Sequence, residues 1–184
     1  MNKFYITTPL YYVNDEPHIG HAYTTILADI ISRYKRMDGK DVFFLTGNDE
    51  HGQKVQDAAE KRGVTPQEHV DEYVERFKNV WEKLDISFTD FIRTTEKRHT
   101  EKVKAMLIKL HASGDIYLDE YIGLYSVSEE RFITQKESKS GDFRDIKELK
   151  ENNYFFRMSN YQQKLIDHIN NNDEFIKPKS RRNE

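Results

Sequence analysis

The chain has 184 residues, and its 29 Lys and Arg against 32 Asp and Glu give a formal net charge of −3. This charge excludes a uniformly basic nucleic-acid-binding protein, although a local basic patch remains compatible with it. The absence of cysteine excludes disulfides and thiolate zinc sites. No apolar run approaches roughly 18 residues, and the first residues pass directly into a strand pattern, so we expect no membrane-spanning helix, no signal peptide and a cytoplasmic protein.

Strand and helix patterns alternate along the first 114 residues. Residues 4–8 are aromatic and β-branched and predict a buried strand that ends at Pro9. Helical periodicity predicts a helix from His18 to about residue 37, and the apolar run 42–46 is typical of a parallel strand covered on both faces. The other elements expected here are helices over 53–61, from 65 onward and over 97–112, and a strand over 88–94. This alternation predicts a parallel, doubly wound sheet, in which ligands bind beyond the carboxyl ends of the strands.

The helix that begins after Thr65 has the strongest local signals. Thr65 is a suitable N-cap, Pro66 occupies the first helical position and Glu68 the third. We interpret the aromatic and aliphatic residues at helical spacing as core rather than as a binding surface: Val70, Tyr73, Val74, Phe77 and Trp81.

After Gly114 the sequence changes to short strand patterns. Residues 116–118 and 123–127 predict two strands that pair with each other, and the polar stretch 135–142 predicts a flexible loop. We also expect a short strand over 132–134, a strand over 153–157 and a helix over 161–170 with Leu165 and Ile169 facing inward.

The most informative segment is His18-Ile19-Gly20-His21, where the first helix is expected to begin. Two imidazoles three residues apart share one face of the first turn, where free backbone N–H groups and the positive end of the helix dipole favour phosphates. Gly20 allows a flat ligand to approach the backbone. The same His-x-x-His spacing also fits a solvated helix face or half of a metal site, so these four residues alone leave both alternatives open.

The segments around this pair carry a family resemblance. The chain resembles the N-terminal catalytic half of the methionyl-tRNA synthetases, which are class I aminoacyl-tRNA synthetases, over residues 7–24, 44–52, 91–99 and 153–159. The histidine signature by itself indicates only a class I synthetase or a related nucleotidyltransferase. The stretches Gly-Asn-Asp-Glu-His-Gly (47–52) and Tyr-Phe-Phe-Arg (154–157) are the ones that match the methionine enzymes.

The resemblance implies an α/β fold in three parts. Residues 1–114 would form the first half of a Rossmann-type nucleotide-binding catalytic domain, 115–157 a small mixed α+β, antiparallel connective insertion, and 158–184 a return helix toward a second half that this sequence lacks. Ser126 and Glu129 stand where many members have zinc-ligating cysteines, so the insertion resembles the zinc-free branch and we expect no structural zinc.

The resemblance also implies the chemistry. The family activates methionine with ATP to give methionyl-adenylate and then passes the methionyl group to the 3′ end of tRNA. The resemblance assigns His18, Gly20 and His21 to the binding of ATP. In the family both histidines are catalytic because they donate hydrogen bonds to the phosphates of ATP. Mg²⁺ would be bound to the same phosphates. The side chains assigned to methionine are Pro9, Leu10, Tyr12, Asp49 and His51. Asp49 would hold the ammonium group, although without the resemblance residues 49–51 fit an ordinary charged loop equally well.

Most of the methionine pocket and the lysine loop that clamps pyrophosphate belong to the missing half of the family's catalytic domain. We therefore expect the ligase activity of a complete enzyme, with methionine, ATP and tRNA as partners. From this chain alone we expect little or no activity and at best weak binding of ATP. One alternative is a non-catalytic half-domain, which would pair its exposed edge at residues 4–6 with a complementary C-terminal half or with a second copy. Another is a related His-x-Gly-His nucleotidyltransferase, although this chain has no candidate clamp motif.

Overall fold

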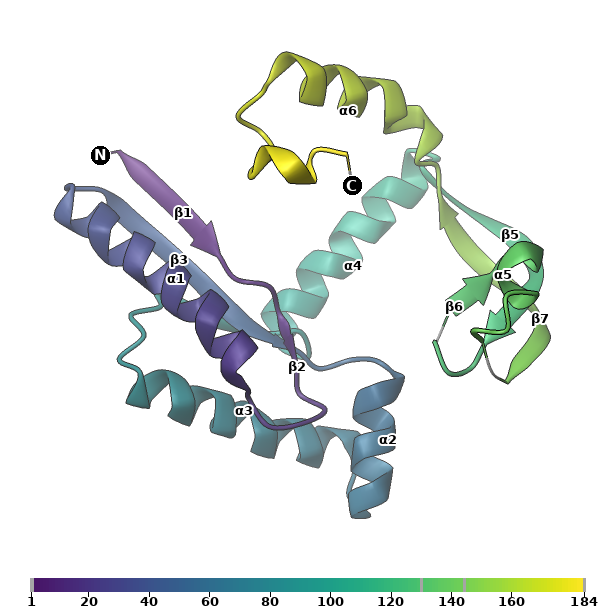
Figure 1. Ribbon diagram of the computed structural model, residues 1–184, viewed down its shortest axis with the longest axis horizontal. Coiled ribbons are helices and arrows are strands. Elements are labelled where there is room, and N and C mark those ends of the chain that lie inside the picture. The colour runs from purple at the N-terminus through teal and green to yellow at the C-terminus, as the bar shows by residue number, and fades with distance from the viewer. Residues whose placement is uncertain (1, 130, 144, 184) are drawn as a thin grey trace. The chain divides into compact units, whose positions relative to one another are not determined.

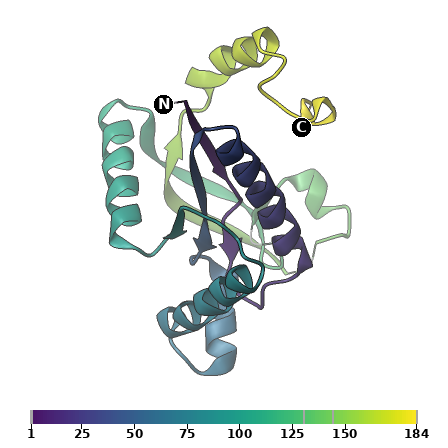
Figure 2. The same cartoon turned by 90° about the vertical axis from the view of Figure 1, so that its left-hand side faces the viewer.

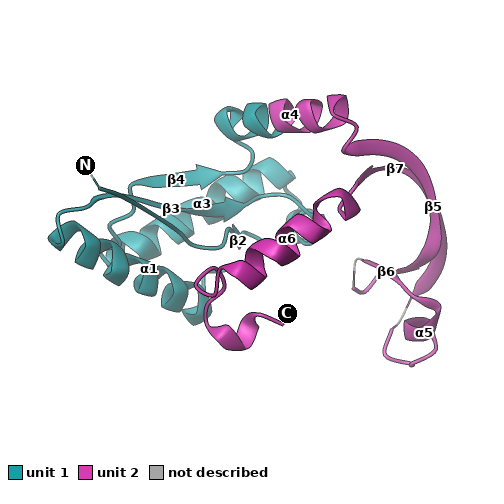
Figure 3. Ribbon diagram, turned by 90° about the horizontal axis from the view of Figure 1, so that it is seen from above, with its two compact units in different colours: residues 1–103 teal, residues 104–184 magenta. Residues whose placement is uncertain are grey.

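The computed structural model describes residues 2–129, 131–143 and 145–183 (Figure 1). The chain forms two compact units, residues 1–103 and 104–184, which divide within helix α4 (Lys97–Ala112) (Figure 3). No helix in the described ranges is long and apolar enough to cross a membrane.

The first unit is built on a parallel sheet. Its elements are β1 (Lys3–Thr7), β2 (Tyr11–Tyr12), α1 (Ile19–Met37), β3 (Asp41–Asp49), α2 (Gln53–Arg62), α3 (Pro66–Lys83), β4 (Asp90–Arg93) and the start of α4. Strand β3 is central: it pairs with β1 and β2 on one side and with β4 on the other, always in parallel. The parallel sheet predicted from the sequence is thus confirmed, and β1 lies at the sheet edge as expected.

Helices α1 and α3 lie side by side on one face of this sheet (Figure 2). The rings of His21 on α1 and Phe77 on α3 are 5.3 Å apart. Right-handed β–α–β connections place both helices on the same face, since the chain moves in one direction from β1 to β3 to β4. The opposite face is partly open in this unit, because Tyr5 is 62% exposed and Phe43 is 42% exposed. The predictions that β1 is buried and that β3 is covered on both faces are therefore wrong.

The core of the unit lies between β2, α2 and α3. Thr65 and Glu68 form the expected capping box at the start of α3, and the inward stripe of that helix is buried. The core cluster consists of Tyr11, Val13, Val55, Val70, Val74, Phe77 and Trp81. The interpretation of the α3 aromatics as core residues is confirmed for Phe77 and Trp81.

Helix α1 buries a polar face. Its buried residues are Thr25, Ala28, Asp29 and Ser32. Burial raises the pKa of Asp29, but hydrogen bonds from Ser87 and the neighbouring Arg33 outweigh it and hold that pKa below its ordinary value. Most of the larger apolar residues of α1 are exposed instead: Ile19, Tyr23, Ile26, Leu27, Ile30, Tyr34 and Met37.

The second unit contains an antiparallel sheet in the order β6-β5-β7. Beyond α4 its elements are β5 (Ile116–Ser126), β6 (Arg131–Ile133), α5 (Gln135–Ser138), β7 (Ile146–Phe156), α6 (Ser159–Asn171) and a 3₁₀ turn, Lys179–Arg181. The two strands predicted to pair within 116–127 are one continuous strand, which pairs with β7 along its whole length. The predicted loop contains α5, and Leu165 of α6 is exposed rather than inward.

Candidate active site

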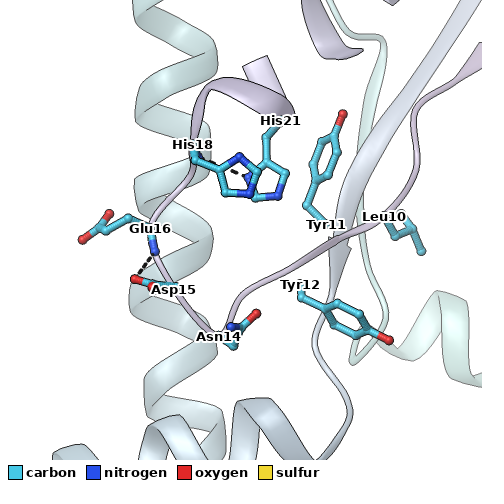
Figure 4. Close-up of a pocket in the computed structure, with 8 residues that line it drawn as sticks. All are labelled: Leu10, Tyr11, Tyr12, Asn14, Asp15, Glu16, His18 and His21. Atoms are coloured by element: carbon cyan, nitrogen blue, oxygen red, sulfur yellow. Dashed lines mark hydrogen bonds between the residues drawn. The ribbon is translucent and has the colours of Figure 1, made fainter. Parts of the chain in front are cut away.

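The carboxyl end of β1 meets β3 at a pair of buried hydroxyl groups. The Oγ1 atoms of Thr8 and Thr46 lie 2.8 Å apart. The chain then breaks strand pairing at Pro9 and Leu10 before β2 resumes it beside the last residues of β3. A cavity of about 410 Å³ opens beside this break (Figure 4), and its lining residues are Leu10, Tyr11, Tyr12, Asn14, Asp15, Glu16, His18 and His21.

His18 and His21 cap the amino end of α1 with their own rings. The backbone N–H of Gly20 donates to Nδ1 of His18 at 3.1 Å, and the backbone N–H of His18 donates to Nδ1 of His21 at 3.3 Å. The two rings stack with centroids 3.6 Å apart. This is the reciprocal arrangement of a capping box, made here by two imidazoles instead of a hydroxyl and a carboxylate.

The cap decides which ring nitrogen carries hydrogen. Because Nδ1 of each ring accepts a backbone N–H, the neutral form of each ring carries its hydrogen on Nε2. No hydrogen bond within the described part of the chain uses the Nε2 atom of His18 or His21. The helix therefore presents two N–H donors beside the cavity, together with the free backbone N–H groups of its first turn.

His21 is the more enclosed of the two rings. It lies 4.7 Å from the ring of Tyr11 and 5.3 Å from that of Phe77. Burial lowers the pKa of His21 below 6.5, and the nearby His18 lowers it further. A neutral His21 is consistent with the cap, since protonation would place a hydrogen on Nδ1 and repel the N–H of His18.

Gly20 has a second role beside the one expected from the sequence. A Cβ atom at this position would lie 3.0 Å from Cε1 and 3.1 Å from Nδ1 of His18. A side chain would therefore press on the capping ring, so glycine here also preserves the stacked pair of imidazoles.

The residues assigned to methionine lie in two groups. Leu10 and Tyr12 line the cavity with the histidines, whereas Asp49 and His51 do not. Asp49 is instead the register partner of Tyr12 across β2 and β3, and its Oδ1 accepts the backbone N–H of His51 at 3.2 Å. Pro9 is exposed and does not line the cavity. The structure thus brings Asp49 next to Tyr12, at the edge of the site rather than in its wall.

A buried ion pair, which sequence reasoning missed, holds the end of β3, whose last residue is Asp49. The side chain of Glu50 is 0% exposed, and Arg93 of β4 contacts both of its oxygens, Nε to Oε1 at 2.5 Å and Nη2 to Oε2 at 3.2 Å. Arg93 also contacts Asp71 of α3. Burial lowers the pKa of Arg93, but these two carboxylates outweigh it and raise that pKa above its ordinary value. The available signal was that Glu50 and Arg93 both lie where neighbouring parallel strands end.

The described residues contain no group of three His, Asp or Glu side chains arranged to hold a metal ion. At the positions where zinc-binding relatives would have cysteines, the Ser126 hydroxyl is 3.1 Å from that of Ser128 and accepts the backbone N–H of Glu129 at 3.3 Å. A hydroxyl and an exposed carboxylate do not fit a structural zinc site, which needs sulfur and nitrogen ligands.

Comparison with known proteins agrees with the interpretation of this site as a nucleotide-binding site. A family model described as "tRNA synthetases class I (M)" matches residues 4–142. The chain belongs to this family. That membership decides against a separate His-x-Gly-His nucleotidyltransferase.

Two curated relatives and one solved structure show how far the similarity extends. The chain is 49% identical to the methionine–tRNA ligase of Listeria monocytogenes over 100% of its own length and 30% of the relative's. It is 50% identical to that of Fusobacterium nucleatum over 99% of its own length and 29% of the relative's. The structure of Mycobacterium tuberculosis methionyl-tRNA synthetase in complex with methionyl-adenylate is 43% identical and has a TM-score of 0.90, over 100% of this chain and 38% of that one. This chain therefore spans about a third of its relatives, and its Rossmann-type fold class is confirmed.

Proposed function

We propose that this chain supplies the first half of the active site of a methionine–tRNA ligase. The family membership, the relatives and the cavity at the amino end of α1 support this proposal. Because the chain spans about 30% of those relatives, the complete reaction requires the remaining polypeptide as well. Residues 115–157 would be the connective insertion, and 158–184 would return the chain to the second half.

His18, Gly20 and His21 would bind ATP. The observation that carries this assignment is the double imidazole cap, which leaves both Nε2–H groups free beside the cavity. Oxygen atoms of the triphosphate would accept a hydrogen bond from Nε2–H of each ring, and Mg²⁺ would be bound to the phosphates. The positive end of α1 adds to the attraction.

Methionine would lie across β2 and β3. The Asp49 carboxylate would accept the methionine ammonium group, with His51 holding that carboxylate in place through its backbone N–H. Tyr12, the register partner of Asp49, would shape the pocket, and Leu10 would contact the substrate through its backbone, with Pro9 fixing the turn.

The reaction in the complete enzyme follows from this placement. A methionine carboxylate oxygen attacks the α-phosphorus of ATP, the bond from that phosphorus to the bridging oxygen breaks, and pyrophosphate leaves. Negative charge develops on the phosphate oxygens, where the two imidazole N–H groups offset it. A ribose hydroxyl of the tRNA 3′ end then attacks the methionyl carbonyl, and AMP leaves. No covalent bond to the protein is needed, so catalysis rests on placement and charge stabilisation.

The open surfaces of the first unit fit a complementary half. Within the described residues, strand β1 pairs with β3 alone, and most of the larger apolar residues of α1 are exposed. An unpaired strand edge beside apolar surface is a template for another strand. We propose that the second half of the fold occupies it; association of two copies of this chain is the competing outcome.

Methionine-dependent ATP–pyrophosphate exchange tests the proposal. We expect little or no exchange from the chain alone and clear exchange when the missing second half is supplied as a separate polypeptide. Strong exchange by the chain alone would contradict the half-site assignment. If neither the chain alone nor the combination with the second half shows exchange, the result would instead support the non-catalytic half-domain.

A further inference from the structure

The segment between β2 and the histidines is fixed at both ends by helix α3. Its first residue, Val13, is fully buried, and the Val13 carbonyl accepts a hydrogen bond of 2.8 Å from Nε2 of His69. At the other end, Glu16 forms an ion pair with Arg76. Both partners lie on α3, two turns apart, so one rigid helix holds the segment that leads to His18.

The ring of His69 is itself locked in one state. Arg62, the last residue of α2, approaches Nδ1 of His69 at 3.0 Å. Since a guanidinium can only donate, Nδ1 must accept, and the hydrogen must be on Nε2, where it serves Val13. His69 is 0% exposed, and its ring stacks on Tyr73 at 4.3 Å.

The two anchors belong to one connected network. Glu72 contacts both Arg62 and Arg76, and both guanidinium groups lie over the ring of Tyr73, at 5.2 Å and 4.3 Å. A continuous series of contacts therefore runs from the Val13 carbonyl through His69, Arg62, Glu72 and Arg76 to Glu16. We refer to these four side chains, His69, Arg62, Glu72 and Arg76, as the α3 clamp.

The clamp matters because packing alone does not hold the segment. Asn14 and Asp15 line the candidate ATP cavity on one side (Figure 4) and a second cavity of about 410 Å³ on the other. The second cavity is also lined by Arg62, His69 and Tyr73. With open space behind it, the segment could move away from the phosphates unless the hydrogen bonds of the clamp fix it.

We propose that His69 and Arg76 are positioning residues for ATP: they hold the segment 13–16 so that it forms one wall of the phosphate site and begins α1 at His18. This role rests on the proposed function. Neither side chain touches the nucleotide, and both act through the backbone and carboxylate that they hold. A shift of about 1 Å in such a supporting wall can weaken a bound state or transition state substantially.

The test compares matched variants of the chain, each combined with the second half used in the exchange assay, by MgATP titration followed through the His21 ring signals in NMR spectra. Replacing His69→Leu should weaken MgATP binding by about tenfold or more, because the Val13 carbonyl loses its donor. Replacing His69→Gln supplies an amide donor near the position of Nε2 and should restore binding to within about threefold. Amide exchange at residues 14–16 should be faster in the Leu variant and near normal in the Gln variant.

Arg76→Gln is an independent test, because the Arg76 side chain is nearer the surface than the buried His69 ring. Its replacement should therefore destabilise the fold less than replacement of His69. Its charge-matched control is Lys78→Gln on the same helix, whose partner Glu75 is 2.7 Å away and does not belong to the clamp. Arg76→Gln should weaken MgATP binding and Lys78→Gln should not.

Normal MgATP affinity in a folded His69→Leu variant, or equal losses in the Leu and Gln variants, would overturn the positioning role. Absence of any MgATP response in the unsubstituted chain combined with the second half would overturn the proposed function itself, and the role of the clamp with it. A failure of the positioning role appears only in the His69 variants, whereas a failure of the proposed function appears already in the unsubstituted protein.

Discussion

Arg93 donates hydrogen bonds to both carboxylate oxygens of Glu50, whose side chain has no exposed surface. Thr95 adds a hydrogen bond of 2.5 Å to the same carboxylate, and the backbone N–H of Glu50 donates to the Thr94 hydroxyl at 2.9 Å. These contacts fasten the end of β3 to the end of β4. The neighbouring Asp49, the last residue of β3, is therefore held at a fixed strand end rather than on a mobile loop.

Removing the arginine alone should damage the fold severely. Arg93→Met leaves the Glu50 carboxylate buried without its counter-ion, which costs about 3–5 kcal/mol in such pairs. The double variant Glu50→Leu with Arg93→Met removes both charges and should be more stable than the single variant. Urea unfolding followed by circular dichroism measures both; equal stabilities of the single variant and the original chain would contradict the role assigned to the pair.

Gly47 should tolerate no side chain. A Cβ atom there would lie 2.0 Å from the backbone oxygen of Ile92 on β4, so Gly47→Ala forces the two strands apart. We expect a loss of about 1–3 kcal/mol in the free energy of unfolding. The control is Gly39→Asn, at a positive φ of 71° with no atom within 4 Å, where asparagine is tolerated. Comparable losses from the two substitutions would argue against close contact at Gly47.

Stability should fall below pH 6.5 because of His21. The pKa of His21 is lowered in the folded chain, so between 6.5 and the folded pKa the unfolded state binds more protons. The contribution of His21 to stability is therefore fully present above pH 6.5 and is lost as pH falls through that window. Replacing His21→Asn should flatten this part of the stability profile. An unchanged slope in the variant would show that other groups cause it.

The same ring should be essential for activity once the second half is present. His21→Ala removes one donor to the phosphates and part of the α1 cap, and we expect pyrophosphate exchange in the reconstituted enzyme to drop by about 10²- to 10³-fold. The substitution His111→Ala, at an exposed position near the end of α4, serves as a histidine control that should leave the rate unchanged. Normal exchange with His21→Ala would remove His21 from the phosphate site.

Local signals were enough to predict much of this fold. Helix α3 begins at its capping box and buries the expected stripe, and α4 has the predicted bounds, because caps and periodicity act within a few residues. The continuous strand β5 was missed because its pattern is interrupted near Gly123, and it is held instead by pairing with β7, about 30 residues further along the chain.

The site divides in the same way. The importance of His18 and His21 is visible in the sequence, but their mutual cap is not, since histidine is not a usual capping residue. The pairing of Glu50 with Arg93 and of His69 with the Val13 carbonyl joins residues more than 40 positions apart. Neither pairing has a periodicity or fixed spacing in the sequence. The one signal for Glu50 and Arg93 was their place at the ends of neighbouring parallel strands, and His69 with Val13 had none.

The central claim is that the two imidazoles at the start of α1 present Nε2–H donors to a triphosphate. Long-range ¹H–¹⁵N NMR spectra of the histidine-labelled chain combined with the unlabelled second half, recorded with MgATP and with adenosine, test it most directly. We predict the Nε2–H form of both rings at neutral pH, and ring shifts that appear with MgATP but not with adenosine. The Nδ1–H form in either ring, or equal responses to the two ligands, would contradict the claim.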